Sequence, residues 1–335
     1  MIGKPRVVVI TGASAGVGRA TALEFARHGA NLALIARNCE ALEATRREIE
    51  ALGVHALVLP LDVADAQAVE RAAERTESEL GPIDVWVNDA MVTVFSPTAL
   101  LQADEIRRVT EVTYLGTVHG TLSAVRRMLP RNRGAIVQVG SALAFRAIPL
   151  QAAYCGAKFA IRGFTSSLRT ELLHNHSRVH ITIVQMPALN TPQFDWARTR
   201  MPGRPQPVPP IFEPEVAARA IYWAARHRRR ELYVGASTLA AVWGNRLLAP
   251  LLDRYMARTA YTAQTSSQLV EPDRRDNLWR SIDGHHSARG RFTDRARTRS
   301  SQLWLATHRG ALLMAGIAGL TLAGLATRRR RDHAG

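Results

Sequence analysis

The stretch Val7-Val8-Val9-Ile10-Thr11-Gly12-Ala13-Ser14-Ala15-Gly16-Val17-Gly18-Arg19-Ala20 joins a short apolar run to a turn that contains three glycines. Four consecutive apolar residues, mostly β-branched, predict a buried strand of a parallel sheet. The turn Thr-Gly-x-x-x-Gly-x-Gly follows at once, and residues 20–28 predict a helix that stops at Gly29. The order of strand, glycine-rich turn and helix indicates a site for a pyrophosphate at the helix N-terminus.

A second predicted strand, residues 31–36, ends at Arg37. In dinucleotide-binding folds an acidic residue near this point binds the ribose 2′-hydroxyl and selects NAD. Ala36 and Arg37 offer no carboxylate, and the Arg37 guanidinium, together with Ser14 and Arg19, can pair with a 2′-phosphate instead. The alternative is that Arg37 is one of many solvated arginines. We interpret the position as favouring NADP(H) over NAD(H).

A tyrosine and a lysine four residues apart, Tyr154 and Lys158, form the second informative motif. Only two of the 44 basic residues are lysines, Lys4 and Lys158. On a helix the two side chains share one face, and an ammonium beside a phenol favours the phenolate and lowers the phenol pKa. Such a tyrosine can donate and accept protons near neutral pH. Without a nucleotide-binding start upstream, the same spacing would be an ordinary surface pair.

Other motifs follow the glycine-rich turn at the distances typical of one enzyme family. Each follows a predicted strand, at residues 56–61, 85–87, 136–140 and 181–185. The motifs are Asp62-Val63, Asn88-Asp89-Ala90-Met91, Ser141, and Pro187-Ala188-Leu189-Asn190-Thr191.

With these residues the chain resembles a classical short-chain dehydrogenase/reductase from about residue 5 to about residue 240. The resemblance implies an α/β fold of the Rossmann type, a doubly wound parallel sheet with helices on both faces. It also implies cofactor contacts from Gly12, Ser14, Gly16, Val17, Gly18, Arg37, Asp62, Val63, Asn88, Ala90, Tyr154, Lys158, Pro187 and Thr191.

The same resemblance implies a hydride transfer between NADP(H) and a carbonyl or alcohol. Ser141 would bind the carbonyl oxygen, Tyr154 would act as acid or base, and Lys158 would lower the Tyr154 pKa and bind the nicotinamide ribose. The chain departs from the family pattern at Met91 and Ala188, which stand where the family has glycines. Thr113 replaces an asparagine that holds a relay water, so we expect Thr113 to take over that role with a different geometry.

Residues 187–214 hold 8 of the 16 prolines and predict a stiff lid over the substrate. Phe194, Trp196, Ile211 and Phe212 either line an apolar pocket or pack the lid onto the core. The substrate is expected to be a small carbonyl or alcohol compound of lipophilic character, and nothing in the sequence names it.

The chain divides into three predicted parts: a catalytic domain over residues 1–240, a helical and basic linker region over 241–309, and a membrane-associated helix over 310–327. Residues 239–258 predict an amphipathic helix, whose apolar face we expect to pack on the catalytic domain or a second subunit rather than on a membrane. Residues 260–300 are polar and predict a loop with partial disorder. His285-His286 stand without a carboxylate or cysteine cluster, so we expect no metal site.

Eighteen uncharged residues, 310–327, lie between Arg309 and a run of four arginines at 328–331. As a helix they span roughly 27 Å, close to the thickness of a bilayer's apolar core, although the alternative is a buried or dimerising helix. Residues 236–335 carry 16 basic and 7 acidic side chains. This basic tail is expected to bind anionic lipid rather than nucleic acid, because no nucleic-acid motif is present. We expect a cytoplasmic protein with a C-terminal membrane anchor.

Two cysteines, Cys39 and Cys155, suit a reducing compartment. By resemblance, a homo-oligomer is expected through the helices that carry Tyr114 and Tyr154. A second hypothesis remains open: a non-catalytic NADPH-binding sensor or scaffold that acts through its basic C-terminal tail. The intact Ser141, Tyr154 and Lys158 favour the enzyme.

Overall fold

Seven parallel strands form the centre of the computed structural model, which describes residues 6–271, 273–284 and 286–310. β1 (Val7–Thr11) pairs with β2 (Asn31–Ala36) on one side and with β4 (Val85–Asn88) on the other. The strand order is β12-β7-β6-β4-β1-β2-β3, and the direction of strand addition reverses between β1 and β4. The predicted doubly wound parallel sheet is therefore confirmed. The remaining strands are β3 (Ala56–Pro60), β6 (Ala135–Ser141), β7 (His180–Met186) and β12 (Glu231–Tyr233).

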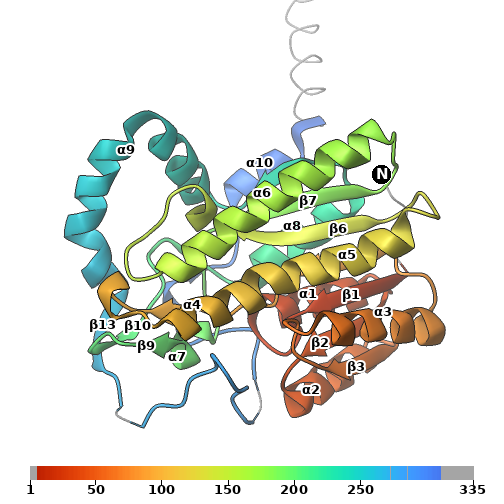
Figure 1. The fold of residues 1–335 in the computed structure, drawn as a ribbon, viewed down its shortest axis with the longest axis horizontal. Helices are drawn as coiled ribbons and strands as arrows, with labels where there is room; N and C mark the ends of the chain where they lie inside the picture. Colours follow the sequence, from red (N-terminus) through yellow and green to blue (C-terminus); the bar gives the residue numbers. More distant parts are fainter. Residues whose placement is uncertain (1–5, 272, 285, 311–335) are drawn as a thin grey trace, which may run out of the picture.

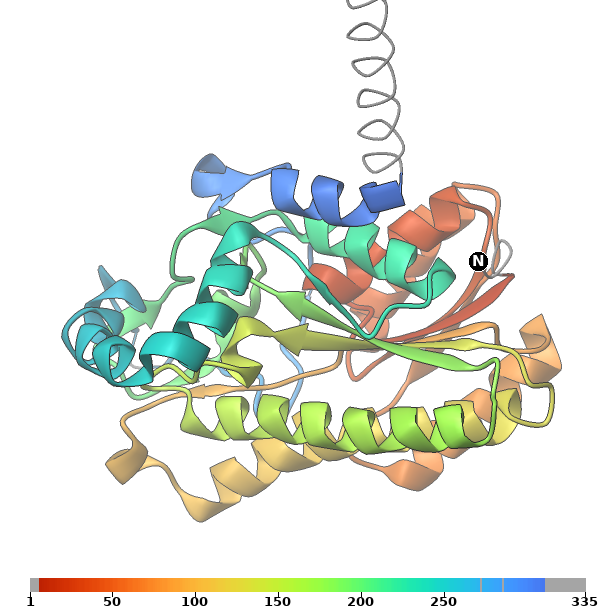
Figure 2. The ribbon, with the colours of Figure 1, turned by 90° about the horizontal axis from the view of Figure 1, so that it is seen from above.

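Helices cover both faces of the sheet (Figures 1 and 2). Side chains of β1 alternate between the two faces, because successive residues of a strand point in opposite directions. Val8 and Ile10 belong to one core cluster, and Val7 and Val9 belong to the other. The first cluster packs under α1 (Gly16–Arg27), α2 (Cys39–Glu50) and α8 (Pro214–Arg226), and the second under α3 (Ala66–Leu80), α5 (Gly116–Met128) and α6 (Ala152–His174).

A π-helical turn interrupts the helix that precedes β6. α4 (Ala103–Val109) runs into the turn η2 (Thr110–Leu115), which continues directly into α5. Such wide turns are frequent at functional sites. Thr113 lies in this turn, beside the loop that follows β4.

Short elements complete the rim of the sheet above the carboxyl ends of its strands. They include a three-stranded ribbon in the order β14-β11-β8, the pair β10 with β13, and the pair β5 with β9. The elements are β5 (Val94–Phe95), η1 (Thr98–Leu100), η3 (Ala142–Ala144), β8 (Ala188–Leu189), α7 (Gln193–Trp196), β9 (Arg198–Thr199), β10 (Gly203–Pro205), β11 (Ile211–Phe212), β13 (Thr265–Leu269), η4 (Thr293–Arg295) and β14 (Ala296–Arg297). α10 (Ser301–Thr307) lies apart from this rim, with Leu303 and Ala306 in the core cluster under α1 and α8.

The amphipathic helix predicted near residue 250 is present as α9 (Ala236–Ala263), but its apolar face is not covered by the catalytic domain. The helix is kinked at Leu248, two residues before Pro250, and it projects from the end of the sheet (Figure 2). Trp243, Leu247 and Tyr255 are 56%, 73% and 60% exposed. The described part of the catalytic domain leaves much of this face exposed, although Arg146 contacts the middle of the helix at Asn245 and Asp253. Packing on a second subunit, the other expected alternative, remains a prediction.

The polar segment predicted as a loop over residues 260–300 has little regular structure after β13, but it packs closely. Leu278 is fully buried and Phe292 is 6% exposed. Partial disorder was expected from the low apolar content, but the described part of the segment is ordered. Two apolar side chains and many backbone hydrogen bonds hold it.

No helix within the described ranges has both the length and the apolar character needed to cross a bilayer. The predicted membrane helix at 310–327 lies outside the described residues except for Gly310, as does the arginine run at 328–331.

A buried polar cluster joins β4, β6 and α5 in the core. The Trp86 indole donates to Asn88 Oδ1 at 2.9 Å, and Asn88 Nδ2 donates to Gln138 Oε1 at 2.9 Å and to Thr121 Oγ1 at 3.1 Å. Asn88 is 3% exposed. Since buried polar groups are costly when unpaired, Asn88 supports the sheet where β4 meets β6.

We predict that Asn88→Ala lowers the free energy of unfolding by about 1–3 kcal/mol for each partner left unpaired, because the Trp86 indole N–H and the Gln138 Oε1 then lack a partner. Chemical denaturation measures the change. Asn175→Ala is the matched control, since Asn175 is exposed. Equal stability of the two variants would contradict a structural role for Asn88.

Candidate active site

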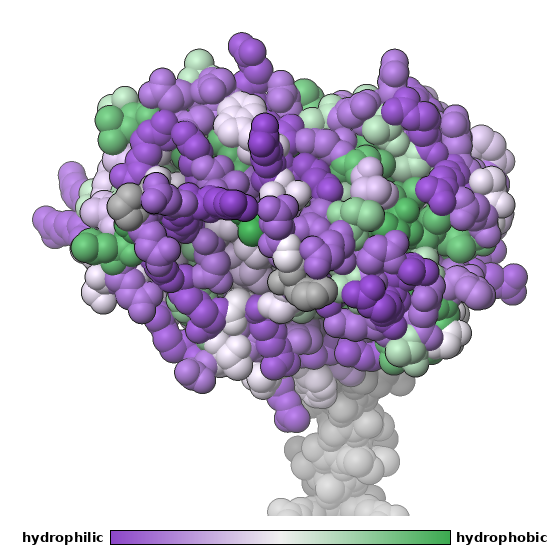
Figure 3. All heavy atoms as spheres, turned by 90° about the horizontal axis from the view of Figure 1, so that it is seen from below, coloured by the Kyte–Doolittle hydropathy of each residue, from purple (hydrophilic) through white to green (hydrophobic). Residues whose placement is uncertain are grey.

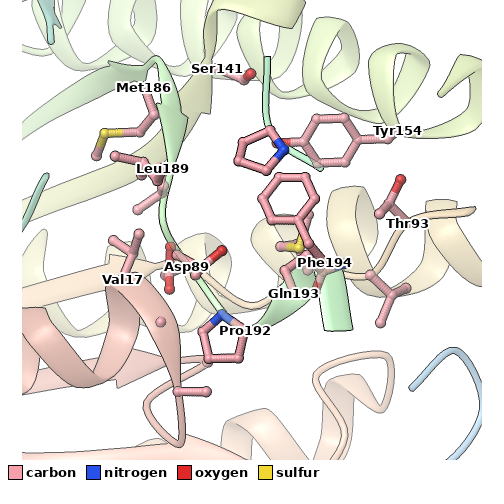
Figure 4. A pocket seen from close by; sticks show the side chains of 18 of the residues that line it. Val17, Asp89, Thr93, Ser141, Tyr154, Met186, Leu189, Pro192, Gln193 and Phe194 are labelled. Atoms are coloured by element: carbon pink, nitrogen blue, oxygen red, sulfur yellow. The ribbon is translucent and has the colours of Figure 1, made fainter. Parts of the chain in front are cut away.

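A cavity of about 450 Å³ opens at the carboxyl ends of β1, β4, β6 and β7. This position is the switch point of the sheet, where ligands bind in open parallel sheets. Figure 4 shows side chains from the glycine-rich loop, from the end of β4, from α6 and from the lid around it. Thirteen of the predicted site residues line this cavity: Gly12, Ser14, Gly16, Val17, Arg37, Asp62, Val63, Ala90, Ser141, Tyr154, Lys158, Pro187 and Thr191.

The glycine-rich loop is packed so tightly that two of its positions exclude a side chain. Gly12 has φ +76°, and a Cβ there would lie 3.0 Å from the backbone of Ala90. A Cβ at Gly18 would lie 2.2 Å from the Gly12 carbonyl oxygen. Thr11 Oγ1 accepts hydrogen bonds from the backbone N–H groups of Asp89 and Ala90 at 3.0 and 3.1 Å. The loop is therefore fixed against the end of β4, where it forms one wall of the cavity.

Ser141, Tyr154 and Lys158 come together on the opposite wall. Ser141 ends β6, and its Oγ accepts from the Leu143 N–H at 3.1 Å. Tyr154 and Lys158 lie one turn apart on α6, with Lys158 Nζ 5.5 Å from the centre of the Tyr154 ring. Lys158 is 4% exposed, and its ammonium donates to the Val139 carbonyl at 2.7 Å.

The electrostatic environment of Tyr154 differs from the sequence prediction. Burial raises the pKa of the phenol well above its usual value, and the interaction with Ser141 offsets only part of that rise. The net pKa of Tyr154 is therefore raised in this structure, and the lowering contribution of Lys158 remains a prediction. The physical reason is desolvation, which disfavours the phenolate. At neutral pH Tyr154 is a phenol and hence a proton donor.

Asp89 is the charged neighbour of Lys158 in the cavity. Burial lowers the pKa of the Lys158 ammonium to about 8, and the negative charge of Asp89 acts against that shift. Burial also raises the pKa of the Asp89 carboxyl to about 7, while Lys158 lowers it. The two groups therefore titrate as a coupled pair close to neutral pH. In the sequence Asp89 was part of the motif after β4 and had no predicted role of its own.

Two predicted site residues lie behind the cavity wall. Thr113 is fully buried, and its hydroxyl donates to the Val92 carbonyl at 3.0 Å and accepts from the Val92 N–H at 3.1 Å. Both hydrogen bonds tie the π-helical turn to the loop after β4. Asn88 belongs to the buried cluster with Gln138 described above. Gly18 does not line the cavity either. Its lack of a side chain lets the glycine-rich loop take its shape.

Arg37 lies at the carboxyl end of β2, at the far end of the cavity from Tyr154. Its guanidinium donates to the carbonyls of Asn277 at 2.5 Å and Leu278 at 3.3 Å. Next to it, Arg108 forms an ion pair with Asp62 and donates to the same Leu278 carbonyl at 3.0 Å. The end of the cavity is thus positively charged and closed by the C-terminal segment.

The apolar lid residues were expected either to line a pocket or to pack the lid onto the core, and both arrangements occur. Phe194 and Trp196 line the cavity. Ile211 and Phe212, in β11, are 1% and 3% exposed and pack in the interior. The lid is held by a buried ion-pair group in which Glu105, on α4, accepts from Arg198 at 2.5 Å and Arg200 at 2.6 Å.

Sequence reasoning missed the cavity residues that come from the C-terminal part of the chain. α9 and the residue after it contribute Ser237, Thr238, Met256 and Gln264, and the polar segment contributes Asn277, Ser281, Ile282 and His286. These residues form no motif and lie far along the chain from the glycine-rich loop. The available signal was the apolar pair Leu278-Trp279 in a polar stretch.

Comparison with known proteins gives a consistent result. The family model described as short chain dehydrogenase matches residues 6–201. The chain is 33% identical over 320 residues to the uncharacterized oxidoreductase YxnA of Bacillus subtilis (strain 168), covering 95% of this chain and 89% of that protein. It is 31% identical over 192 residues to the 3-dehydrosphinganine reductase of Danio rerio, covering 56% of this chain and 57% of that protein.

A solved structure agrees with the architecture. The alcohol dehydrogenase from the archaeon Thermococcus sibiricus, complexed with 5-hydroxy-NADP, matches with a TM-score of 0.59 at 28% sequence identity. The match covers 68% of this chain and 95% of that chain.

We predict that the Lys158 ammonium titrates near pH 8 and that Asp89→Asn lowers this value by about one pH unit, because the variant loses the negative charge that favours the ammonium. The chain has only two lysines, so NMR of protein labelled at lysine Nζ gives two signals, and Lys4→Arg assigns them. Glu111→Gln, outside the cavity, serves as a charge-matched control. A Lys158 pKa that rises in Asp89→Asn would contradict the pairing.

Proposed function

The chain belongs to the short-chain dehydrogenase family, and we propose that it is an NADP(H)-dependent reductase of a lipophilic carbonyl compound. Family membership makes it an enzyme that acts on CH–OH or C=O groups with a nicotinamide cofactor. The observation that carries the finer proposal is the convergence of Ser141, Tyr154 and Lys158 on one cavity that also contains the glycine-rich loop.

The residues present fit a dinucleotide. Gly12 and Gly18 leave no room for a Cβ, and they bring the loop backbone to the cavity wall at the N-terminus of α1. A pyrophosphate would be held at this helix end, the adenine end beside Asp62 and Val63, and the nicotinamide end beside Pro187 and Thr191. When bound, the reduced nicotinamide supplies the hydride.

The protein side chains would then stabilise the negative charge on the carbonyl oxygen and donate a proton to it. The Ser141 hydroxyl donates a hydrogen bond to this oxygen and stabilises the negative charge that develops on it. Tyr154 transfers its phenolic proton to the same oxygen. The phenol is protonated at neutral pH, so it has this proton to supply. Lys158, with its ammonium inside the cavity, would bind the ribose hydroxyls and stabilise the phenolate left after proton transfer.

The preference for NADP(H) rests on the charge at the end of β2. Arg37 stands where NAD-selective folds place an acidic residue, and its guanidinium has five N–H donors. Two of these nitrogens donate to the Asn277 and Leu278 carbonyls, so further N–H groups remain for a 2′-phosphate. Ser14, in the same part of the cavity, supports this assignment.

A lipophilic substrate is supported by the side chains around Tyr154. The lid and α9 surround the catalytic end of the cavity with apolar groups, which favour an alkyl or aromatic substrate over a sugar. The relative from Danio rerio is named for a 3-dehydrosphinganine substrate, which is consistent with a lipid ketone as a class. The apolar residues at this end are Phe95, Leu143, Ile148, Met186, Phe194, Val208 and Met256.

Self-association through α5 and α6 remains part of the proposal. Leu122 on α5 and Phe159 on α6 are 41% and 43% exposed, which supports burial against a second copy. The C-terminal membrane anchor and the division of the chain at residues 240 and 309 remain predictions.

We predict that Tyr154→Phe lowers turnover by at least about 10²-fold, because the variant lacks the proton donor, while its affinity for NADPH stays within about threefold of wild type. The measurement is NADPH oxidation against a panel of alkyl and aryl ketones and aldehydes, with binding followed by fluorescence. Tyr255→Phe, at an exposed tyrosine of α9, is the control. Tight NADPH binding by wild type without turnover on any substrate would favour the sensor hypothesis.

We predict that Arg37→Ala weakens NADPH binding by about ten- to a hundredfold and NADH binding by much less, because a charge-assisted hydrogen bond to the 2′-phosphate is lost. Titration of both cofactors measures the ratio. Arg47→Ala, an exposed arginine of α2, controls for the loss of a positive charge. Equal losses for the two cofactors would exclude the 2′-phosphate role.

A further inference from the structure

A segment from the C-terminal part of the chain crosses the open side of the cavity. We define the strap as residues 276–284 and 286–290, which run from the lid near α7 to the N-terminus of α1 (Figure 1). It lies outside the part of the chain that matches the family model, residues 6–201. Its contacts to the catalytic domain fall into three groups, and all three involve residues next to the cavity.

The first group fixes the strap at the end of β2. Leu278 is fully buried in the same core cluster as Val63. Its carbonyl accepts from Arg37 at 3.3 Å and from Arg108 at 3.0 Å. The neighbouring Asn277 carbonyl accepts from Arg37 at 2.5 Å. One apolar side chain and three charge-assisted hydrogen bonds therefore hold this end.

The second group joins the strap to the glycine-rich loop. The Gly16 N–H donates to the Ser287 carbonyl at 3.1 Å, and Arg19 donates to the His286 carbonyl. Asn38 Nδ2 donates to the Ile282 carbonyl at 2.5 Å. These donors come from the start of α1 and of α2, the two helices that follow β1 and β2.

The third group fixes the strap to the lid. The Gly290 N–H donates to the Asn190 carbonyl at 3.2 Å, and just beyond the strap the Phe292 N–H donates to Asn190 Oδ1 at 2.9 Å. A Cβ on Gly290 would lie 2.6 Å from the Thr191 carbonyl oxygen, so only glycine allows this approach. Asn190 is completely buried.

The cavity extends beneath the strap. Asn277, Ser281, Ile282 and His286 line it from the strap side, and the predicted cofactor residues line it from the sheet side. We propose that the strap is the outer wall of the dinucleotide site and closes over the adenosine and pyrophosphate half of the bound cofactor. This proposal rests on the proposed NADP(H)-dependent function and adds residues that no family motif supplies.

The strap could close over the bound cofactor, which we call a clamp, or the cofactor could displace it. The contacts agree better with a clamp. The strap contacts Arg37 only through neutral backbone carbonyls, so these contacts leave the charge of the Arg37 guanidinium available to a phosphate. The face of the molecule over which the strap runs is largely hydrophilic (Figure 3), with Leu278 buried beneath it. A polar cover held by one apolar side chain can open locally. Opening would then limit the rate of cofactor release.

We predict that Leu278→Asp raises the dissociation rate of NADPH by at least about tenfold, because a charged side chain cannot remain in the core and the strap is released. Gly290→Val tests the same element from the other end without changing the core. Leu269→Asp, at a leucine that is 75% exposed, and Gly310→Ala, with no atom within 4 Å of the added Cβ, are the matched controls. The rate is measured on the full chain by stopped-flow fluorescence with excess NADP as the competitor.

Limited trypsin digestion provides a second measurement. Arg275, Arg280 and Arg289 are exposed sites in and next to the strap. A clamp predicts that NADPH slows cleavage at these sites in wild type and that both strap variants reduce this protection. Faster cleavage with NADPH, or tighter NADPH binding by the variants, would show that cofactor displaces the strap and would overturn the proposal.

The failure of this proposal can be told apart from the failure of the proposed function. A wild-type chain that binds no dinucleotide would refute the proposed function and the clamp together. A wild-type chain that binds NADPH and is matched by both strap variants in dissociation rate and trypsin protection would refute the clamp alone.

Discussion

The close contact between the glycine-rich loop and the end of β4 is the constraint on which the site depends. Gly18 lies so close to the Gly12 carbonyl that no side chain fits, and Thr11 bonds the backbone after β4. Because β1 and β4 flank the switch point of the sheet, this contact places the N-terminus of α1 beside the cavity. The catalytic wall, formed by β6 and α6, then faces the loop across one opening. A side chain at Gly12 or Gly18 would separate the two walls.

Burial of charge is the second organising feature. Lys158 is almost fully buried beside Asp89, and desolvation moves both groups towards neutral pH. Burial also raises the pKa of Tyr154, and the interaction with Ser141 offsets only part of that rise. The phenol is therefore protonated at neutral pH.

The sequence predicted the sheet and the residues on its carboxyl edge, since strand runs and turn motifs are local signals. The predicted strand at 31–36 has the same bounds in β2. It did not predict that Asn88 and Thr113 have structural partners, because Gln138 and Val92 are 50 and 21 residues away. Nor did it locate the strap, whose hydrogen bonds to Arg37, Arg108 and Asn38 use its backbone carbonyls, groups that every residue type carries. Local sequence patterns identify helices and strands. They do not reveal the contacts that backbone groups make with distant parts of the chain.

The C-terminal part of the chain lines one side of the cavity and contacts each of the other parts of the site separately. Gln264, just after α9, accepts from Gln151 at 2.7 Å and donates to the Pro149 carbonyl at 2.9 Å, immediately before the catalytic helix α6. Asn190 holds the end of the strap on the lid, and Arg37 holds its start beside β2. One continuous segment thus contacts the catalytic helix, the lid and the cofactor loop. If the strap closes over the cofactor as proposed, its opening breaks some of these contacts, and cofactor exchange would then be linked to access of the substrate to Tyr154.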